Sequence, residues 1–558
     1  MPETDVVIIG SGGAGLAAAL TVGAGGASVT VLEASAAFGG TTAVSGGGMW
    51  LPGNTLDPNF TDSMDDAKAY VQRLTLGFVP DSIIDRYLEE CGRLPDFLSA
   101  NTPLSFTAEV GRPDYYAPWV GSALTSRTVF PRTYEMPRLG EMESRIRKPA
   151  PRGMMPIQHN EEQAFGVRPR LGDGAVARRE DLEAVNRLIA ERLAKRIVLR
   201  GLALVGGMVE GCLQNRTEFV ANSRALELIT ADGRVVGVQA EEDGSTVEYK
   251  ARLGVVLASG GFEWNPDLWD TFMTVPNDAP TSPPTNRGDG LIMAASLGAK
   301  LGNLGQASWV WARYLGEEYD GRPLYRSRSG GNRPGEIIVN RRGRRFMSEG
   351  VTYNDFGREV VHFDVHTYEF TNHPCFVIGD RYCLQRLTDI PPEIYPFSED
   401  PEKPVDDPEK GDGWVVGDTL REVAVQLGID PDGLERQVAE YNEQAIEGVD
   451  RVFNRGSRPW ELHNLPNHES LGPITEGPFV GHRIRAGVFG TRGGPVINAN
   501  AQIIDYHNRP IPGLYGAGAV VAHPFAWAYP GGGGTLGPAL TFGHVAGKSL
   551  LEKRAGSA

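Results

Sequence analysis

A run of glycines near the start of the chain has the residue types and spacing that bind a dinucleotide. An apolar segment over residues 5–9 leads into Gly10, Gly12 and Gly15, and a second apolar segment ends at Glu33. Gly10 permits a tight turn, Gly12 lets backbone N–H groups approach a pyrophosphate, and Gly15 lets a helix pack closely on the strand. Glu33 can accept a hydrogen bond from a ribose 2′-OH. The order of strand, turn, helix and acid predicts a dinucleotide site.

Further glycine clusters mark places where the backbone can approach a ligand or turn at positive φ. They lie among the 71 glycines of the chain, at positions 39–40, 46–48, 260–261, 330–331, 493–494 and 531–534. We interpret positions 330–331 as an ordinary loop, and the other clusters as candidate ligand contacts.

The elements that must position these glycines alternate between strands and helices. Two helical patterns occur within residues 61–100, a helix is expected at about 180–196, and Asp-Gly turns at 232–233 and 243–244 indicate a β-meander. The apolar run over 255–258 is typical of a strand buried on both faces. Two capped helices are expected later, one from near Asp418 to Gly428 and one with Asp430 as N-cap.

The final 70 residues return to glycine-rich apolar sequence, with a strand and then a helix. Residues from about 306 to 488 are richer in Pro, Trp, Tyr and charge, and they interrupt the two halves of dinucleotide-type sequence. The pattern therefore predicts an α/β fold with a discontinuous Rossmann-like domain over 1–305 and 489–558. An α+β capping and catalytic domain, 306–488, is inserted in it.

Composition excludes several kinds of partner. The 558 residues carry a formal net charge of −16, which argues against binding nucleic acid or an anionic membrane surface. The cysteines lie far apart, at positions 91, 212, 375 and 383, and the histidines form no metal-ligand pattern, so no metal site is expected. We find no leader-like segment and no run long enough to span a bilayer, so a soluble, cytoplasmic protein with reduced thiols is expected.

Taken together, these motifs resemble the flavoprotein family that includes fumarate reductases, succinate dehydrogenase flavoprotein subunits and 3-ketosteroid dehydrogenases. The likeness extends over essentially the whole chain, and its matching pieces are residues 10–15, 32–33, 39–48, 256–262, 285–290 and 512–518. It implies a Rossmann-like FAD-binding domain. Members that attach FAD covalently carry a His in the segment matching 41–48, and this chain has none there, so non-covalent FAD is expected.

The resemblance also implies which residues contact FAD. They are Gly10, Gly12, Gly13, Ala14, Gly15, Glu33, Gly40, Thr41, Thr42, Ser45, Gly47, Gly48, Gly260, Gly261, Asp289, Gly518, Gly534 and Leu536. The helix that begins near Leu536 would direct its positive end at the N1 and O2 edge of the flavin.

Within this family the chain resembles the 3-ketosteroid Δ1-dehydrogenases in particular. Residues 39–54 are similar to their flavin-side signature, 529–539 to their active-site turn, and 345–353 to a segment that ends in their catalytic Tyr. Fumarate reductases carry a proton-donating Arg at the position that matches Tyr353. Gly532 and Ser348 depart from the residues common in the steroid enzymes, and residues 117–165 match poorly, which leaves the substrate less certain than the reaction.

The likeness implies a dehydrogenation beside a ketone. The Tyr529 hydroxyl and the Gly533 N–H would hold the ketone oxygen as it gains enolate character. Tyr353 would remove the α-proton, and the β-hydrogen would leave as hydride to flavin N5. Either Tyr115 or Tyr116 would assist the base, and Tyr116 is preferred.

The expected substrate is an apolar cyclic ketone, with a steroid favoured and a role in steroid metabolism, and the electrons would pass to an external acceptor such as a quinone. Trp119, Trp309, Trp311, Phe525 and Trp527 could line the pocket, although core packing is an equal alternative for Trp309 and Trp311.

Three alternatives remain open. One is a desaturase of a smaller oxocyclohexane carboxylate, whose acid could be held by Arg313, Arg333 or Arg358. The second is a fumarate-reductase-like enoate reductase. The third is a flavin-binding electron-transfer or regulatory subunit with no chemistry of its own.

Overall fold

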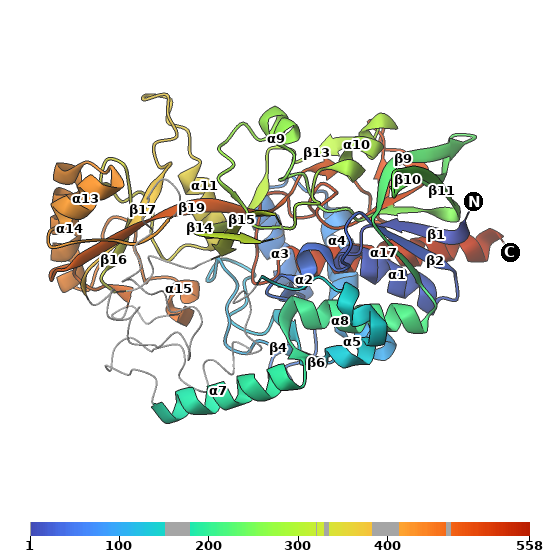
Figure 1. Ribbon diagram of the computed structural model, residues 1–558, viewed down its shortest axis with the longest axis horizontal. Coiled ribbons are helices and arrows are strands. Elements are labelled where there is room, and N and C mark those ends of the chain that lie inside the picture. Colours follow the sequence, from blue (N-terminus) through green and yellow to red (C-terminus); the bar gives the residue numbers. More distant parts are fainter. Residues whose placement is uncertain are drawn as a thin grey trace.

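The computed structural model describes residues 2–150, 179–319, 321–327, 334–381, 412–464 and 470–557. The molecule is elongated and has two main sheets, one toward each end of its long axis (Figure 1). Both chain termini lie at the end that holds the first sheet. In the described residues, no helix combines the length and the apolar character that crossing a membrane would need.

The first sheet brings together strands from both ends of the chain. Its order is β21 (Gln502–Ile504), β22 (Pro510–Gly516), β11 (Ser245–Leu257), β1 (Glu3–Ile9), β2 (Val29–Glu33) and β8 (Glu218–Ala221). The pairs from β22 to β8 are parallel, and β21 pairs antiparallel with β22. The predicted strand over 255–258 forms the end of β11, and its apolar residues are buried, as expected for a strand covered on both faces.

The predicted meander is also confirmed. Strands β9 (Ser223–Ala231) and β10 (Arg234–Glu242) pair antiparallel with each other, and β10 pairs with β11. The two-residue turns use Asp232-Gly233 and Asp243-Gly244, and all four residues have positive φ. This backbone conformation is the one that short hairpin turns require.

Helix α17 (Leu536–Ser557) packs along α1 (Gly13–Ala24), although more than 500 residues separate them in the chain. A Cβ atom on Gly543 would lie 2.3 Å from the Ala14 carbonyl oxygen, so the two helices touch through backbone. The Rossmann-like domain is therefore discontinuous, as the sequence predicts.

The second sheet is mainly antiparallel. Its order is β15 (Arg322–Ser327), β14 (Ala307–Tyr319), β19 (Phe479–Thr491), β17 (Cys375–Gly379) and β16 (Glu336–Asn340), and β12 (Ala279–Pro280) and β18 (Val415–Gly417) also pair with β19. Successive residues of β16 face opposite cores. Ile337 and Val339 pack under α13 (Leu420–Leu427) and α14 (Pro431–Ile446), and Ile338 packs on the side of α11 (Tyr353–Val360). The boundaries at 305/306 and 488/489 remain a proposal, and β12 and β19 extend beyond them.

The helices on this sheet follow their sequence caps closely. Helix α14 (Pro431–Ile446) begins after Asp430, whose side chain accepts from the Asp432 N–H. Helix α13 (Leu420–Leu427) ends at Gly428, but its N-cap is Thr419 and not the neighbouring Asp418, because the Thr419 hydroxyl accepts from the Glu422 N–H. Helix α11 (Tyr353–Val360) begins after Thr352, whose hydroxyl accepts from the Asp355 N–H.

Residues 64–101 form three helices where the sequence predicts two patterns: α3 (Met64–Thr75), α4 (Asp81–Cys91) and α5 (Leu94–Asn101). Helix α7 (Arg179–Ala194) starts and ends close to the predicted range, but Leu193, expected on its buried stripe, is 60% exposed. Its last turn therefore extends past the core that Val185 and Ile189 enter.

The remaining elements are short connections around the two sheets. They are α2 (Gly40–Ala43), β3 (Met49–Trp50), β4 (Phe106–Ala108), β5 (Thr128–Pro131), β6 (Tyr134–Glu135), the 3-10 segment η1 (Met136–Arg145), β7 (Ile197–Val198), α8 (Arg200–Gln214), α9 (Pro266–Phe272), α10 (Asp289–Ser296), β13 (Leu301–Gly302), α15 (Pro459–Asn464) and β20 (Gly494–Pro495).

Candidate active site

The turn between β1 and α1 needs glycine for steric reasons. Gly10 has φ +103°, and a Cβ atom there would lie 2.4 Å from the Ala258 carbonyl oxygen. A Cβ atom on Gly15 would lie 2.0 Å from the Gly10 carbonyl oxygen. At Gly12 the nearest protein atom to such a Cβ is 3.9 Å away. The backbone is thus closed by protein at Gly10 and Gly15 and open at Gly12.

The first turn of α1 has the features of an anion site. Its N-cap, Gly12, has no side-chain cap, and the Gly13 N–H donates to the Thr42 hydroxyl oxygen over 2.9 Å. Gly518 at φ +86° approaches Ala14, since its Cβ would lie 3.0 Å from the Ala14 methyl. The amides of a helix N-terminus favour a phosphate group, so this turn fits the pyrophosphate of a dinucleotide.

Glu33 lies at the end of β2 beside this turn, and it is buried. One carboxylate oxygen accepts from the Ser11 hydroxyl over 2.6 Å, and the other accepts from the Ser35 N–H over 3.0 Å. The hydrogen bonds fix the carboxylate at the end of the strand, where a ribose would have to lie.

The segment after β2 connects this turn to the opposite end of the site. The Gly39 N–H donates to the Ser11 hydroxyl over 2.9 Å, and the short helix α2 carries Thr41 and Thr42. The Ser45 hydroxyl donates to the Thr42 carbonyl over 2.8 Å. A Cβ atom on Gly533 would lie 2.3 Å from Gly48, so the segment ends against the glycine-rich turn 531–534.

A buried acid that the sequence analysis missed lies behind this segment. Glu263 is 1% exposed and accepts from Ser282 over 2.5 Å, from Asn286 Nδ2 over 2.7 Å and from the Thr491 N–H. Burial raises the pKa of Glu263, against these hydrogen bonds. Asn286 Nδ2 also donates to the Thr41 hydroxyl over 3.2 Å. The position of Glu263 directly after the 260–261 cluster is the signal that could have identified it.

The cluster at 260–261 and the nearby Asp289 differ in their surroundings. A Cβ atom on Gly260 would lie 2.5 Å from Asn286 Oδ1, and one on Gly261 would lie 2.3 Å from the Thr491 hydroxyl. Asp289 forms an ion pair with Arg224 over 2.8 Å, and the Arg224 side chain is 48% exposed. The predicted contact of Asp289 with a cofactor stays a prediction, and the partner of Asp289 within the protein is Arg224.

Three tyrosines from distant parts of the chain meet in one cluster. The Tyr115 hydroxyl donates to the Tyr353 hydroxyl over 3.0 Å. The rings of Tyr353 and Tyr529 lie 5.3 Å apart between centroids at 79°, and those of Tyr115 and Tyr529 lie 5.8 Å apart and nearly parallel. Tyr353 is the first residue of α11, so the cap at Thr352 fixes its position.

The preference for Tyr116 over Tyr115 as the neighbour of Tyr353 is wrong. The Tyr116 hydroxyl donates to Asp355 Oδ1 over 2.8 Å, and its ring stacks on Trp119. Consecutive residues of this loop direct their side chains to different surroundings, and it is Tyr115 that reaches the Tyr353 hydroxyl.

Burial has the largest effect on the pKa values of Tyr353 and Tyr115. It raises the pKa of Tyr353 well above its usual value, with further increases from Tyr115 and Tyr529. It raises the pKa of Tyr115 to about 12, and the Arg112 guanidinium opposes this increase. Arg112 is itself paired with Glu109 over 2.7 Å. At neutral pH both phenols are therefore protonated.

The carbonyl groups of the turn that carries Tyr529 have hydrogen-bond partners within the protein. The Pro530 carbonyl accepts from the Tyr70 hydroxyl over 2.7 Å and from the Tyr115 N–H, and the Gly532 and Gly533 carbonyls accept from Thr128 and the Trp50 N–H. In the described part of the chain, no acceptor is found for the Gly533 N–H. The Gly534 N–H donates to the Gly531 carbonyl over 3.1 Å. The Gly533 N–H is therefore available to a ligand, and the Tyr529 hydroxyl lies 3.4 Å from the Thr535 hydroxyl.

Several predicted lining residues belong to the core. Trp309 packs against Trp269 and Trp311 against Phe356, both edge to face, and Phe525 is fully buried against Trp50 and Tyr87. Core packing is thus the correct alternative for Trp309 and Trp311. Trp119 is 42% exposed.

The other predicted candidates do not form a second site. Arg313 donates to the Asp412 carbonyl, and Arg333 lies outside the described residues. In the described ranges, no group of three His, Cys, Asp or Glu side chains is placed to hold a metal ion. Cys91, Cys212 and Cys375 are free and buried, and Cys383 lies outside those ranges.

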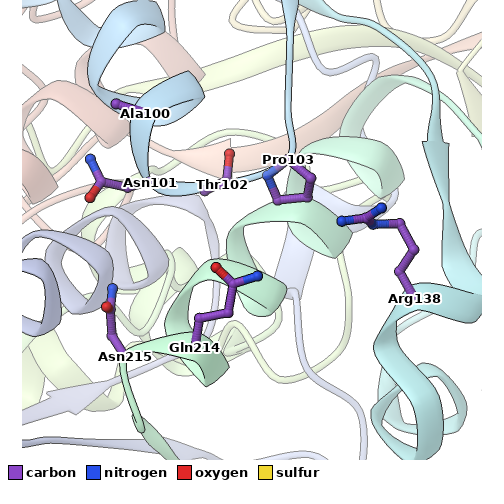
Figure 2. A pocket seen from close by; sticks show the side chains of 7 residues that line it. All are labelled: Ala100, Asn101, Thr102, Pro103, Arg138, Gln214 and Asn215. Carbon is purple, nitrogen blue, oxygen red and sulfur yellow. The ribbon is translucent and has the colours of Figure 1, made fainter.

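Figure 2 shows a separate, open pocket between α5, η1 and the end of α8. Its lining is polar, and its one charged residue, Arg138, forms an ion pair with Glu210 over 2.8 Å. The lining residues are Ala100, Asn101, Thr102, Pro103, Arg138, Gln214 and Asn215. None of them belongs to the tyrosine cluster.

Residues 5–536 match the family described as FAD binding domain. The 4-oxocyclohexanecarboxylate 2-dehydrogenase of Sinomonas cyclohexanicum is 31% identical over 99% of this chain and 93% of its own length. The 3-oxosteroid 1-dehydrogenase of Mycolicibacterium smegmatis is 31% identical over 100% of this chain and 98% of its own length. The crystal structure of 3-ketosteroid delta1-dehydrogenase from Sterolibacterium denitrificans in complex with 1,4-androstadiene-3,17-dione gives a TM-score of 0.89 at 29% identity, covering 99% of this chain and 100% of that chain.

Proposed function

The chain belongs to the FAD binding domain family and is an FAD-dependent oxidoreductase, and from this premise we propose that it introduces a C=C double bond next to a ring ketone. The observation that carries the proposal is the cluster of Tyr115, Tyr353 and Tyr529. A hydroxyl that can act as a base once ionised thus lies close to the Tyr529 hydroxyl, and Gly533 follows Tyr529 on the same turn as a second proposed donor to a carbonyl oxygen.

FAD fits the residues that surround this cluster. The open backbone at Gly12 and the uncapped start of α1 suit the pyrophosphate, and the fixed carboxylate of Glu33 suits the ribose. The segment from Thr41 to Gly48 would lie along the flavin. When bound, FAD supplies the acceptor for the β-hydrogen of the substrate, which leaves as hydride.

The residues of the chain carry the remaining steps. The Tyr529 hydroxyl and the Gly533 N–H donate to the ketone oxygen, so that negative charge can develop on it, and such donors each typically contribute on the order of 10²–10³ in rate. Tyr353 takes the α-proton as its phenolate, so its own hydroxyl proton must first leave to solvent. Because burial holds Tyr353 in its protonated form, it needs help to form the phenolate, and we assign this help to the positive charge of Arg112, with the Tyr115 hydroxyl donating to the Tyr353 oxygen.

The substrate class is a cyclic ketone, and a 3-oxosteroid is our first choice. The Sterolibacterium denitrificans structure in complex with a steroid supports this choice through its TM-score of 0.89. An oxocyclohexane carboxylate is the second choice, since the Sinomonas cyclohexanicum dehydrogenase named for that substrate is 31% identical over nearly the full chain. The electron acceptor, proposed as quinone-like, and the cytoplasmic location remain predictions.

The experiment that tests the function is anaerobic bleaching of the flavin. Holoenzyme is mixed separately with a saturated 3-ketosteroid and with 4-oxocyclohexanecarboxylate, and the absorbance of the oxidised flavin is followed. We expect one of the two ketones to bleach the flavin rapidly and to yield the unsaturated ketone.

The corresponding alcohol, which lacks an acidic α-hydrogen, is the matched control and should leave the flavin oxidised. If neither ketone bleaches the flavin while reduced enzyme is reoxidised by an enoate, the fumarate-reductase-like alternative would replace this proposal. Complete inertness toward ketones and enoates would favour a subunit without chemistry of its own.

A further inference from the structure

Two arginines, one of them fully buried, hold the backbone directly before Tyr529. Arg492 follows β19 and is fully buried, and its Nη1 donates to the Ala528 carbonyl over 2.6 Å. Arg358 lies on α11, and its Nη2 donates to the Trp527 carbonyl over 3.0 Å. Two consecutive carbonyl groups are thus bound by guanidinium groups from two different elements, which fixes the direction in which Tyr529 leaves the turn.

Arg492 also faces the Tyr529 side chain itself. Its Cζ lies 5.4 Å from the centroid of the Tyr529 ring, and its Nη2 lies 3.3 Å from Nε2 of His523. Burial and the charge of Arg492 hold the pKa of His523 well below its usual value, so that His523 is neutral. In the described residues, Arg492 forms no ion pair with a carboxylate, and the same is true of Arg358.

A buried charge in a protein is ordinarily paired. Arg492 and Arg358 disfavour each other's charge, and burial together with this repulsion lowers the pKa of Arg492 to about 9, against Tyr529, Tyr116 and Tyr353. Arg492 is therefore still charged at neutral pH, and it faces the ring of Tyr529, whose hydroxyl is proposed to hold the ketone oxygen. Electrostatic attraction in such a buried place exceeds that in water.

We propose that Arg492 is a positioning residue that directs Tyr529 toward the ketone oxygen and whose unpaired charge stabilises negative charge on that oxygen. The proposal deepens the proposed function and rests on it, because the oxygen concerned is that of the ring ketone. It implies that the site binds an anionic ring oxygen more tightly than a neutral one.

The test uses binding alone and needs no turnover. FAD-loaded enzyme is titrated with 4-nitrophenol near the pKa of the phenol, and difference absorbance distinguishes the bound ion from the bound neutral form. We expect wild type to bind the ion preferentially. Arg492→Gln retains an N–H donor for the Ala528 carbonyl but removes the charge, and it should weaken binding of the ion roughly tenfold or more. Nitrobenzene, which lacks the phenol oxygen, should bind equally well to wild type and to Arg492→Gln.

Arg492→Lys keeps a charge and a donor, and it should retain most of the preference for the ion. Arg421→Gln removes an exposed arginine that pairs with Asp432 and Glu435, and it should bind as wild type does. The proposal is overturned if wild type binds the neutral phenol preferentially, if Arg492→Gln binds the ion as tightly as wild type, or if Arg492→Lys matches Arg492→Gln.

Should Arg492→Gln fail to retain FAD, wild type and Arg492→Lys still decide the question through their preference for ion or neutral phenol. Failure of the proposed function has a different signature. In that case no ring ketone would bleach the flavin, whatever the binding of 4-nitrophenol.

Discussion

At Tyr353 the chemical difficulty is the weak acidity of a buried phenol. Burial, Tyr115 and Tyr529 all raise the pKa of Tyr353 well above its usual value. Tyr353 can therefore remove the α-proton only if the negative charge that develops on the ketone oxygen is stabilised in the same step. Tyr529 and Tyr353 therefore have separate tasks, and they should fail in different ways when each loses its hydroxyl.

We expect Tyr353→Phe to lower the rate of flavin reduction by roughly 10²–10⁴ with nearly unchanged substrate affinity, because the proton acceptor is lost. Tyr529→Phe should weaken both binding and turnover, since a donor to the ketone oxygen is lost in the ground state and in the transition state. Anaerobic stopped-flow reduction over a range of ketone concentrations measures both effects. A wild-type rate of reduction in flavin-loaded Tyr353→Phe would remove the assignment of the base.

The raised pKa of Tyr353 also predicts the pH dependence of flavin reduction. Below that pKa the phenol is protonated, and each pH unit upward increases the fraction of phenolate about tenfold. The rate of reduction at saturating ketone should therefore increase from pH 7 to pH 9 without reaching a plateau. A plateau or a decrease over this range, in enzyme that keeps its FAD, would argue against a buried phenol as the base.

At the scale of elements, the position of Tyr353 depends on how α11 packs on β14. Gly357 lies one turn after Tyr353, and a Cβ atom there would lie 2.3 Å from the Trp309 Cβ atom. Trp309 is held in the core by Trp269 and cannot easily move away. The close approach of helix and strand is therefore possible only with glycine at this position.

Gly357→Ala should destabilise the protein by about 1–3 kcal/mol and displace Tyr353, because an overpacked core shifts the backbone. The unfolding temperature and the rate of flavin reduction should both decrease. The contacts of Trp309 account for the effect, so the double change Gly357→Ala with Trp309→Leu should recover part of the stability. An unchanged unfolding temperature in Gly357→Ala would show that α11 can move without cost.

The contact between α17 and α1 contains a buried histidine, His544. His544 on α17 lies 2.8 Å from the Thr21 hydroxyl on α1, and it is 9% exposed. Burial lowers the pKa of His544 from 6.5 to about 4, although Glu90 opposes the decrease. The folded state thus binds this proton less readily than the unfolded state, so stability should decrease as the pH falls from 6.5 toward 4.

The loss attributable to His544 amounts to about 3 kcal/mol once the pH is near 4. Other groups titrate in the same window, so the measurement compares wild type with His544→Gln, which keeps a polar contact to Thr21 and cannot titrate. The free energy of unfolding by denaturant should differ less between pH 7 and pH 5 in His544→Gln than in wild type. Equal differences in the two proteins would contradict the assignment.

At the scale of the whole molecule, the cofactor site joins segments from both ends of the chain. The turn after β1, the segment from Thr41 to Gly48 and the turn before α17 surround one region, and no histidine lies within residues 41–48. Acid precipitation of the holoenzyme should therefore release all the yellow colour into the supernatant as FAD. Flavin that remains in the pellet after washing would indicate a covalent bond.

Features that depend on periodicity or on local sterics can be predicted from the amino-acid sequence. The Gly10 to Gly15 turn, the Asp-Gly hairpins, the buried strand at the end of β11 and the cap at Asp430 each depend on residues close together in the chain. Local sterics and hydrogen bonds decide such features, so they can be predicted without knowledge of the fold. Tyr353 and Tyr529 are candidates because the short segments that contain them resemble segments of a known family, and periodicity does not identify them.

Which side chains meet depends on the packing of distant elements and follows from the folded structure. Tyr115 and Tyr116 are adjacent in sequence, yet one reaches Tyr353 and the other Asp355, because the loop presents them in different directions. Glu263 accepts from Thr491 and Arg492 donates to Ala528, so both acquire their surroundings from segments distant in the sequence, and nothing near Arg492 in the sequence predicts its burial. The orientation of a side chain and its burial depend on packing between distant elements, and a single sequence does not contain that information in any local pattern.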